Sequence, residues 1–236
     1  MEEHLLRQLV NDFTDLGSRI SAVAKTVDAM QAITTTAVSI LDTAEAASIT
    51  RGTEGQFETV AETSDLPPKV DAIQYELGTG PCVDAALEDC VFRTGDLEHD
   101  ERWPEFGKRA ANDFDVRSML AVRLFLEGQD ELIASLNLYS TARNAFTAED
   151  QARAELIAIY SAAAVNAMSE RERSRNLRVA LESNRQIGVA LGVLMSRYKV
   201  SDDEAFTLMQ MASQRSHRKL RDIAADVVET GDLHLP

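Results

Sequence analysis

The stretch Asn184-Arg-Gln-Ile-Gly-Val-Ala-Leu-Gly-Val-Leu-Met-Ser-Arg-Tyr198 decides the architecture of the C-terminal part of the chain. Its large apolar residues recur at three- and four-residue steps, which predicts a helix. The following Ser201-Asp-Asp-Glu204 is a capping box and predicts the start of a second helix. Gly231 is a typical C-terminal cap for a third helix. The residues that set the period of the first helix are Ile187, Leu191, Leu194 and Tyr198.

Positive charge is concentrated in the same part of the chain. The whole chain has a net charge of −15 at pH 7. Residues 1–168 contain 13 Lys and Arg against 29 Asp and Glu, a net of −16, whereas residues 171–221 contain 11 against 5, a net of +6. Salt screens charges beyond about 10 Å. A locally basic module can therefore attract a polyanion although the chain as a whole is acidic.

This pattern resembles the ANTAR family of bacterial RNA-binding antiterminator domains, which are built of three helices. The resemblance rests on Arg185, Ile187, Ala190, Gly192, Leu194, Met195, Arg197, Ala205, Leu208, Ser213, Leu220, Ala224, Val227 and Val228. It implies that the protein binds RNA. The RNA target of the family is a pair of short stem-loops, which form in place of a terminator. Members of the family often have a basic residue at the position of Gln210 and Asn at the position of His217. The chain departs from the family at both positions. The expected RNA-contacting residues are Arg185, Gly192, Arg197, Ser213, Arg215, His217, Arg218 and Lys219.

An α+β domain with a largely antiparallel sheet is predicted before this module. Leu66-Pro-Pro-Lys69 is expected to be irregular, and hairpin turns are expected at 52–55 and 127–130. Thr147 and Asp150 form an acidic version of a capping box. Strands are predicted over 46–50, 56–61, 91–94, 118–125 and 132–139, and helices over 82–88 and 102–112.

The order of these elements is similar to the GAF fold, a small-molecule sensor domain. The resemblance rests on Leu77-Gly-Thr-Gly-Pro-Cys82, Asp96, Trp103-Pro104 with Phe106, Ser118–Leu124, Leu136–Tyr139 and Phe146–Asp150. GAF followed by ANTAR is a known arrangement, which implies a transcription antitermination regulator with a signal-sensing domain. We therefore expect no enzymatic activity and no resident cofactor, and leave open an unknown small-molecule or protein signal at the sensor.

Long helices are predicted at both ends of the sensor. Residues 3–30 have helical periodicity, with Thr26 and Asp28 as potential caps of a second helix that continues to Leu41. From 149 to 198 the chain contains no Pro, and its polar segment 169–176 is typical of a solvated helical connector. The expected division is a GAF-like sensor at 1–168, a connector at 169–177 and the three-helix module at 178–236.

A homodimer is expected because two apolar stripes have no obvious partner within their own domain. One is Leu5, Leu9, Phe13 and Leu16, and the other is Leu156, Tyr160, Ala163 and Ala167. Gly188 and Gly192 also suggest close approach, since each destabilises a helix by about 1 kcal/mol relative to Ala. We favour helix packing for Gly188, and either a helix or an RNA backbone at Gly192.

Other classes of function are weaker alternatives. Cys82 and Cys90 allow comparison with GAF-type methionine sulfoxide reductases, which need an activated thiolate beside a resolving cysteine. A DNA-binding one-component regulator is a second alternative. The scattered histidines and the two cysteines show no zinc-site spacing. No apolar run reaches about 18 residues, so we expect no membrane span, and two cysteines without a disulfide framework favour a cytoplasmic protein.

Overall fold

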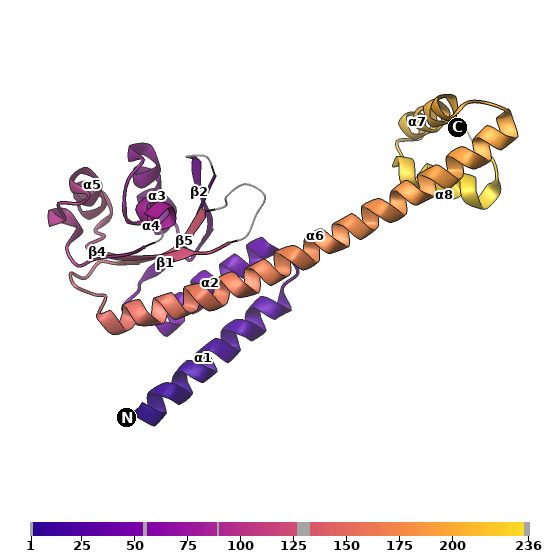
Figure 1. Ribbon diagram of the computed structural model, residues 1–236. Coiled ribbons are helices and arrows are strands. Elements are labelled where there is room, and N and C mark those ends of the chain that lie inside the picture. Colours follow the sequence, from indigo (N-terminus) through magenta and orange to yellow (C-terminus); the bar gives the residue numbers. More distant parts are fainter. Residues whose placement is uncertain (1, 54–55, 89, 127–132, 234–236) are drawn as a thin grey trace. The chain divides into compact units, whose positions relative to one another are not determined.

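The computed structural model describes residues 2–53, 56–88, 90–126 and 133–233 (Figure 1). The chain divides into two compact units, residues 1–169 and residues 170–236. The expected hairpin turns at 52–55 and 127–130 fall partly or wholly outside the described residues, and so does the side chain of Leu5. No described helix has both the length and the apolar character needed to cross a bilayer.

The first unit contains a five-stranded antiparallel sheet in the order β2-β1-β5-β4-β3. Helices α1, α2 and the first part of α6 lie on one side of this sheet, and α3, α4 and α5 lie on the other (Figure 1). The predicted α+β fold is confirmed. Its elements are α1 Glu2–Ala22, α2 Thr26–Ile40, β1 Ala46–Thr53, β2 Gln56–Glu62, α3 Leu66–Leu77, α4 Pro81–Glu88, β3 Val91–Thr94, the 3-10 helix η1 Leu97–His99, α5 Pro104–Phe114, β4 Ser118–Leu124, β5 Ile133–Ser140 and α6 Ala148–Tyr198.

Alternate residues of each strand face opposite layers, because side chains alternate along a strand. Ala47 and Ile49 of β1 join the apolar core beneath α1, α2 and α6, as do Leu136 and Leu138 of β5. The intervening residues, which face α3 and α4, include several polar side chains. Helices thus cover both faces of the sheet, but one face is apolar and the other is partly polar.

Two element predictions are wrong in part or in whole. The first predicted helix ends at Ala22 rather than at residue 30, whereas the second helix does begin at Thr26, one of its two expected caps, after Lys25, which is extended. The break lets Leu16 and Ile33 enter the same core, so burial outweighs continuous periodicity. Residues 66–69 are not irregular but form the first turn of α3. Proline fits there because the first helical N–H groups need no partner within the helix.

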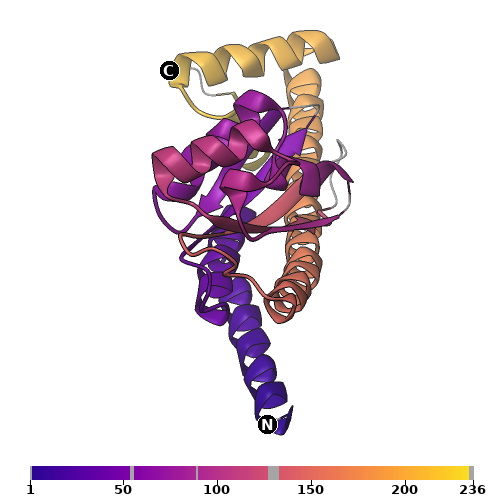
Figure 2. The same ribbon diagram turned by 90° about the vertical axis from the view of Figure 1, so that its left-hand side faces the viewer.

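The expectation that α1 and α6 lack partners within their domain is also wrong in part. The ring of Phe13 meets that of Tyr160 edge to face, with 5.6 Å between centroids, so the helices lie side by side (Figure 2). Leu16 is completely buried. The outer side of α6 nevertheless stays apolar and exposed at Leu156 and Ile159, which are 47% and 63% exposed.

The second unit is a three-helix module formed by the end of α6 with α7, Asp202–Ser216, and α8, Leu220–Thr230. Ser201 and Glu204 form the predicted capping box, and Gly231 adopts φ 71° at the end of α8. These predictions are confirmed, as is the capping pair of Thr147 and Asp150 at the start of α6. The core of the module consists of Ala190, Leu194, Ala205, Met209, Ala212, Ile223, Ala224 and Val227.

Candidate functional site

The eight residues expected to contact RNA lie on three segments of the second unit. Seven are exposed and Ser213 is half-buried. Helix α6 carries Arg185, Gly192 and Arg197, α7 carries Ser213 and Arg215, and the connection to α8 carries His217, Arg218 and Lys219. None of the eight belongs to the buried core of the module.

Two of the basic residues form salt bridges with carboxylates of the same module. Arg197 lies 2.8 Å from Asp232, which also accepts a hydrogen bond from the hydroxyl of Tyr198. Arg218 lies 2.6 Å from Asp226. Both pairs are solvent-exposed, and such pairs contribute only about 0–1 kcal/mol. A phosphate can therefore replace either carboxylate at small cost.

Ser213 and His217 shape the turn between α7 and α8. The Ser213 hydroxyl donates to the carbonyl of Arg218 at 2.6 Å, and the Arg218 N–H donates back to the Ser213 carbonyl at 3.2 Å. His217 adopts the left-handed conformation, with φ 52°, a region in which His, like Asn and Asp, is enriched among residues other than Gly. The structure therefore assigns Ser213 a turn-closing role in the free protein.

Three predicted residues carry charge without an intramolecular ion pair. Within the part of the chain that the structure describes, Arg185, Arg215 and Lys219 take part in none of the salt bridges. Lys219 is also the N-cap of α8, in an extended backbone conformation, and its own side chain provides no cap. These three side chains are the cations most readily offered to a phosphate.

Gly188 and Gly192 have open space beside them in the described part of the chain. A Cβ atom added at either position would meet nothing within 4 Å among the described residues. The prediction that Gly188 packs against a neighbouring helix is therefore wrong within one chain. The partners that remain are a second copy of the protein or, at Gly192, RNA.

The sensor interior contains a polar network that the sequence did not reveal. Asp71 of α3 is completely buried. One carboxylate oxygen accepts hydrogen bonds from Ser48 at 2.8 Å and Thr59 at 3.0 Å. The other accepts hydrogen bonds from Tyr139, from the amide of Gln74 at 3.4 Å and from the thiol of Cys82 at 3.3 Å. All five donors are neutral.

Burial raises the pKa of Asp71, although the hydrogen bonds from Tyr139, Ser48 and Cys82 oppose the rise. An unpaired charge in a protein interior is costly, and a buried carboxyl group commonly becomes neutral instead. Beside it, Asn137 donates to Ser48 at 3.1 Å and Thr50 at 2.9 Å, whereas its buried carbonyl oxygen has no protein partner among the described residues. This face of the sheet can therefore hold a proton.

A sequence signal for this network was available. Within 66–77, Pro67, Val70, Asp71 and Gln74 recur at three- and four-residue steps, so a helix places them on one side. Polar residues at alternate positions of a strand, such as Ser48 and Thr50, ordinarily indicate a solvent-facing side. Here helices α3 and α4 cover them, which a single sequence does not show.

The cysteines lack the arrangement that thiol catalysis needs. Cys82 is completely buried, and burial together with the adjacent Asp71 raises the pKa of its thiol. A nucleophilic cysteine instead needs a lowered pKa and access to solvent. Cys90 is exposed, and both cysteines are free.

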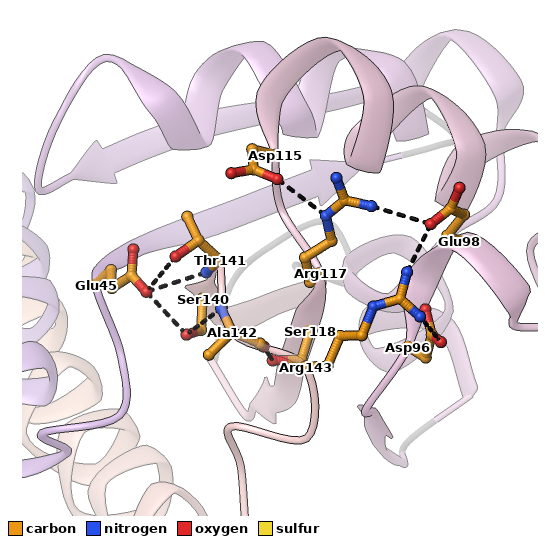
Figure 3. Close-up of polar contacts among 10 residues, drawn as sticks. All are labelled: Glu45, Asp96, Glu98, Asp115, Arg117, Ser118, Ser140, Thr141, Ala142 and Arg143. Carbon is orange, nitrogen blue, oxygen red and sulfur yellow. Dashed lines mark hydrogen bonds and ion pairs between the residues drawn. The ribbon is translucent and has the colours of Figure 1, made fainter.

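A network of ion pairs fixes the chain between β5 and α6 (Figure 3). Glu98 accepts from Arg143 at 2.7 Å and from Arg117 at 2.9 Å, and Arg143 also reaches Asp96. On the other side, Glu45 accepts from the hydroxyl of Thr141 at 2.7 Å.

Three side chains of this region, Asp96, Glu98 and His99, are close enough together to share a metal ion. However, Arg143 and Arg117 already compensate the two carboxylates. The group therefore serves to position the start of α6.

The sequence matches two family descriptions. Residues 2–166 match the GAF domain family, and residues 175–228 match the ANTAR domain. No curated protein gives a significant match to the chain.

Solved structures share the sensor fold at low sequence identity. The GAF domain of a phosphoenolpyruvate-protein phosphotransferase from Coxiella burnetii has a TM-score of 0.53 and 14% identity, covering 71% of this chain and 98% of its own. Free methionine-R-sulfoxide reductase from Neisseria meningitidis, in complex with its substrate, has a TM-score of 0.53 and 14% identity, covering 71% and 91%. A bacteriophytochrome from R. palustris has a TM-score of 0.56 and 13% identity, covering 89% and 47%.

These likenesses show the fold of the sensor and nothing about its chemistry, because enzymes and sensors share it. The family matches go further, since together they cover both compact units in the expected order. The chain belongs to the GAF domain family and continues into an ANTAR domain, so it is a GAF–ANTAR regulator.

Proposed function

We propose that this protein is an RNA-binding antitermination regulator, which binds a pair of short stem-loops and so prevents formation of a terminator. The observation that carries the proposal is the ANTAR match at 175–228, folded as a three-helix module with exposed cations at Arg185, Arg215 and Lys219. Its action needs no chemistry by the protein. Binding shifts the population of RNA folds toward the hairpins.

Hairpin loops suit this surface better than a regular duplex does. The deep, narrow major groove of A-form RNA excludes side chains, whereas unpaired loop bases are open to stacking and hydrogen bonding. His217 and Tyr198 are exposed aromatic side chains near the cations of the module, and both are able to stack. Phosphate contacts from the cations would position the RNA, and contacts to loop bases would give specificity.

A homodimer would place two modules on the two hairpins. In the first unit, an apolar groove is lined by Leu9, Val10, Phe13, Thr14, Leu156 and Tyr160. Beside it Ile159 is 63% exposed. Contiguous exposed apolar surface of this kind marks an interaction site, and a second copy offers a self-complementary partner. Two linked modules gain affinity through high effective concentration.

The sensor would regulate this assembly in the cytoplasm, where bacterial transcripts are made. A signal at the GAF domain would change the dimer and with it the placement of the modules. Helix α6 is the element shared by the proposed dimer surface and the RNA-binding module. The ion-pair network around Arg143 and Glu98 fixes its start within the sensor.

Charge removal on the module tests the proposal. The double variant Arg218→Ala, Lys219→Ala should keep its fold, because buried Ile223 anchors α8. Its affinity for a two-hairpin RNA with randomised loops should fall, and the log–log salt slope should decrease by roughly 0.7–0.9 for each lost phosphate contact. Gel shifts at several salt concentrations measure both quantities, and circular dichroism checks the fold.

The matched control is Lys25→Ala with Lys69→Ala, which removes the same charge from exposed positions of the sensor. It should bind RNA like the unmodified protein. If the Arg218 and Lys219 variant also binds with unchanged affinity and slope, this face is solvated surface and the proposed site is wrong.

A further inference from the structure

Four exposed arginines form a ridge on the part of α6 that precedes the packed core of the ANTAR module. They are Arg171, Arg175, Arg178 and Arg185, all within the second compact unit. Their separations of four, three and seven residues are close to whole turns of a helix with 3.6 residues per turn. The four side chains therefore project from one side of α6, and we call this set the arginine ridge.

The arginine ridge carries uncompensated charge. Between residues 171 and 185 there are five arginines and two glutamates, a net of +3. In the described chain, the ion pair found in this stretch joins Arg173 to Glu170 at 3.7 Å, and Arg173 lies on another side of the helix. Glu182 is on the same side as the ridge but pairs with none of its arginines.

Most arginines of the sensor behave differently. Arg19, Arg51 and Arg109 each hold a carboxylate on the surface of the sensor. The same is true of Arg102, Arg117, Arg143 and Arg153. An arginine that serves only to keep a surface soluble readily finds such a partner in a chain with 39 acidic residues. The four arginines of the ridge, by contrast, form no salt bridge with any carboxylate of the described chain.

The geometry of the ridge suits a chain of phosphates. A rise of 1.5 Å per residue separates neighbouring arginines by roughly 4.5–10.5 Å along the axis and makes the ridge about 21 Å long. All four residues are arginines, whose planar guanidinium groups bind phosphate oxygens in pairs. Leu177 and Leu181, which are 60% and 61% exposed, lie about a quarter turn away. An apolar partner on that stripe would leave the ridge accessible.

We propose that Arg171, Arg175 and Arg178 continue the RNA contact of Arg185 along the arginine ridge and bind backbone phosphates flanking the loops held by the three-helix module. The inference rests on the proposed RNA-binding function and extends its site toward the N-terminal end of α6. Backbone contacts carry no base information. The ridge therefore contributes affinity that does not depend on loop sequence, while the module supplies the discrimination between loops.

The test uses the full chain with Arg171→Gln, Arg175→Gln and Arg178→Gln combined. Glutamine has a helix propensity close to that of arginine, so α6 should persist. Affinity for the two-hairpin RNA should fall roughly 10- to 100-fold at 0.15 M salt, and the log–log salt slope should decrease by about 2. The same fold-loss is expected for RNAs that differ in loop sequence. The matching triple lysine variant should retain most of the slope.

Two controls separate the ridge from charge in general. Lys25→Gln, Lys69→Gln and Lys108→Gln combined make the same change in net charge at exposed positions of the sensor, and Arg173→Gln removes one charge from another side of α6. Both should bind RNA like the unmodified protein. Equal losses in the sensor-lysine variant and the ridge variant would overturn the inference, because overall charge would then explain both.

The outcomes also separate this inference from the function on which it rests. If the unmodified protein binds RNA and the ridge variant binds equally well with the same salt slope, the ridge is solvated surface and the RNA-binding function stands. If the unmodified protein binds no RNA hairpins, the proposed function itself fails. If affinity rises in the ridge variant, the ridge holds an acidic protein segment and the inference is wrong.

Discussion

Tyr139 of β5 donates a hydrogen bond from its hydroxyl to Asp71 of α3, and both side chains are completely buried. This contact joins the central sheet to a helix that covers its polar face. Ser48 and Thr59 bind the same carboxyl group from two further strands. One acidic residue thus connects three strands and two helices of the sensor, and its protonation bears on the stability of that layer.

Asp71→Asn should reduce the pH dependence of sensor stability. Because burial raises the pKa of Asp71 in the folded state, the stabilisation by its neutral form is complete below the unfolded pKa of about 3.9. That stabilisation is lost as pH rises through the folded value. The neutral asparagine avoids this loss, since neighbouring hydroxyls can turn to accept its N–H groups. The melting temperature of Asp71→Asn should therefore rise relative to that of the unmodified protein as the pH increases from 4 to 8.

The control for this prediction is Asp113→Asn, which makes the same charge change at an exposed position. Its melting temperature should follow that of the unmodified protein at every pH. A constant deficit of Asp71→Asn across the pH range would mean that hydrogen-bond geometry, rather than the buried charge, dominates at this site.

Ile159→Asp should convert the protein to a monomer. Ile159 is 63% exposed in one chain, so aspartate costs little in the isolated fold. In the proposed dimer it would place a charge within an apolar contact, which is strongly unfavourable. Light scattering at micromolar concentration measures the mass. Leu87→Asp, at a residue of α4 that is 54% exposed, should remain dimeric, and a monomeric mass for the unmodified protein would refute the dimer.

Gly192→Ala should stabilise α6 and weaken RNA binding. Both Gly188 and Gly192 have open space where a Cβ atom would stand, so alanine at either should stabilise the helix by about 1 kcal/mol. If an RNA backbone approaches Gly192, the added methyl group obstructs it. Thermal melts and gel shifts measure the two effects. Unchanged RNA affinity in Gly192→Ala would remove this residue from the proposed site.

Ser201→Ala should destabilise the three-helix module by about 1 kcal/mol through loss of its N-cap. Ser201 accepts from the N–H of Glu204 at 3.3 Å, and its own N–H donates to the Glu204 carboxylate at 2.8 Å. Hydrogen exchange of amides in α7 measures the change locally. Ser196→Ala, an exposed serine on α6, should have almost no effect. Equal protection of α7 in both variants would show that the cap contributes little.

Local signals predicted the elements well where short-range chemistry sets them. The capping boxes at Thr147 and Ser201 depend on residues three apart, and both occur as predicted. The five strands follow alternation and turns in the sequence. By contrast, the end of the first helix at Ala22 depends on how two helices share one core, which periodicity alone does not contain.

The candidate sites differ in the same way. The basic residues of the module are recognisable from their clustering and their resemblance to a family, but the sequence does not show that Asp226 and Asp232 hold Arg218 and Arg197. Asp71 lies in a segment for which no helix or strand is predicted from the sequence. Its burial depends on a sheet assembled from strands up to 68 positions away in sequence, at Tyr139.

Direct comparison of nucleic acids tests the central claim that this protein binds paired RNA hairpins. The full chain would be titrated at 0.15 M salt with a two-hairpin RNA pool with randomised loops, a single-hairpin pool and duplex DNA of similar length. We predict the tightest binding to the two-hairpin pool, weaker binding to single hairpins and the weakest to duplex DNA. Binding to duplex DNA that equals or exceeds binding to both RNA pools would contradict the account.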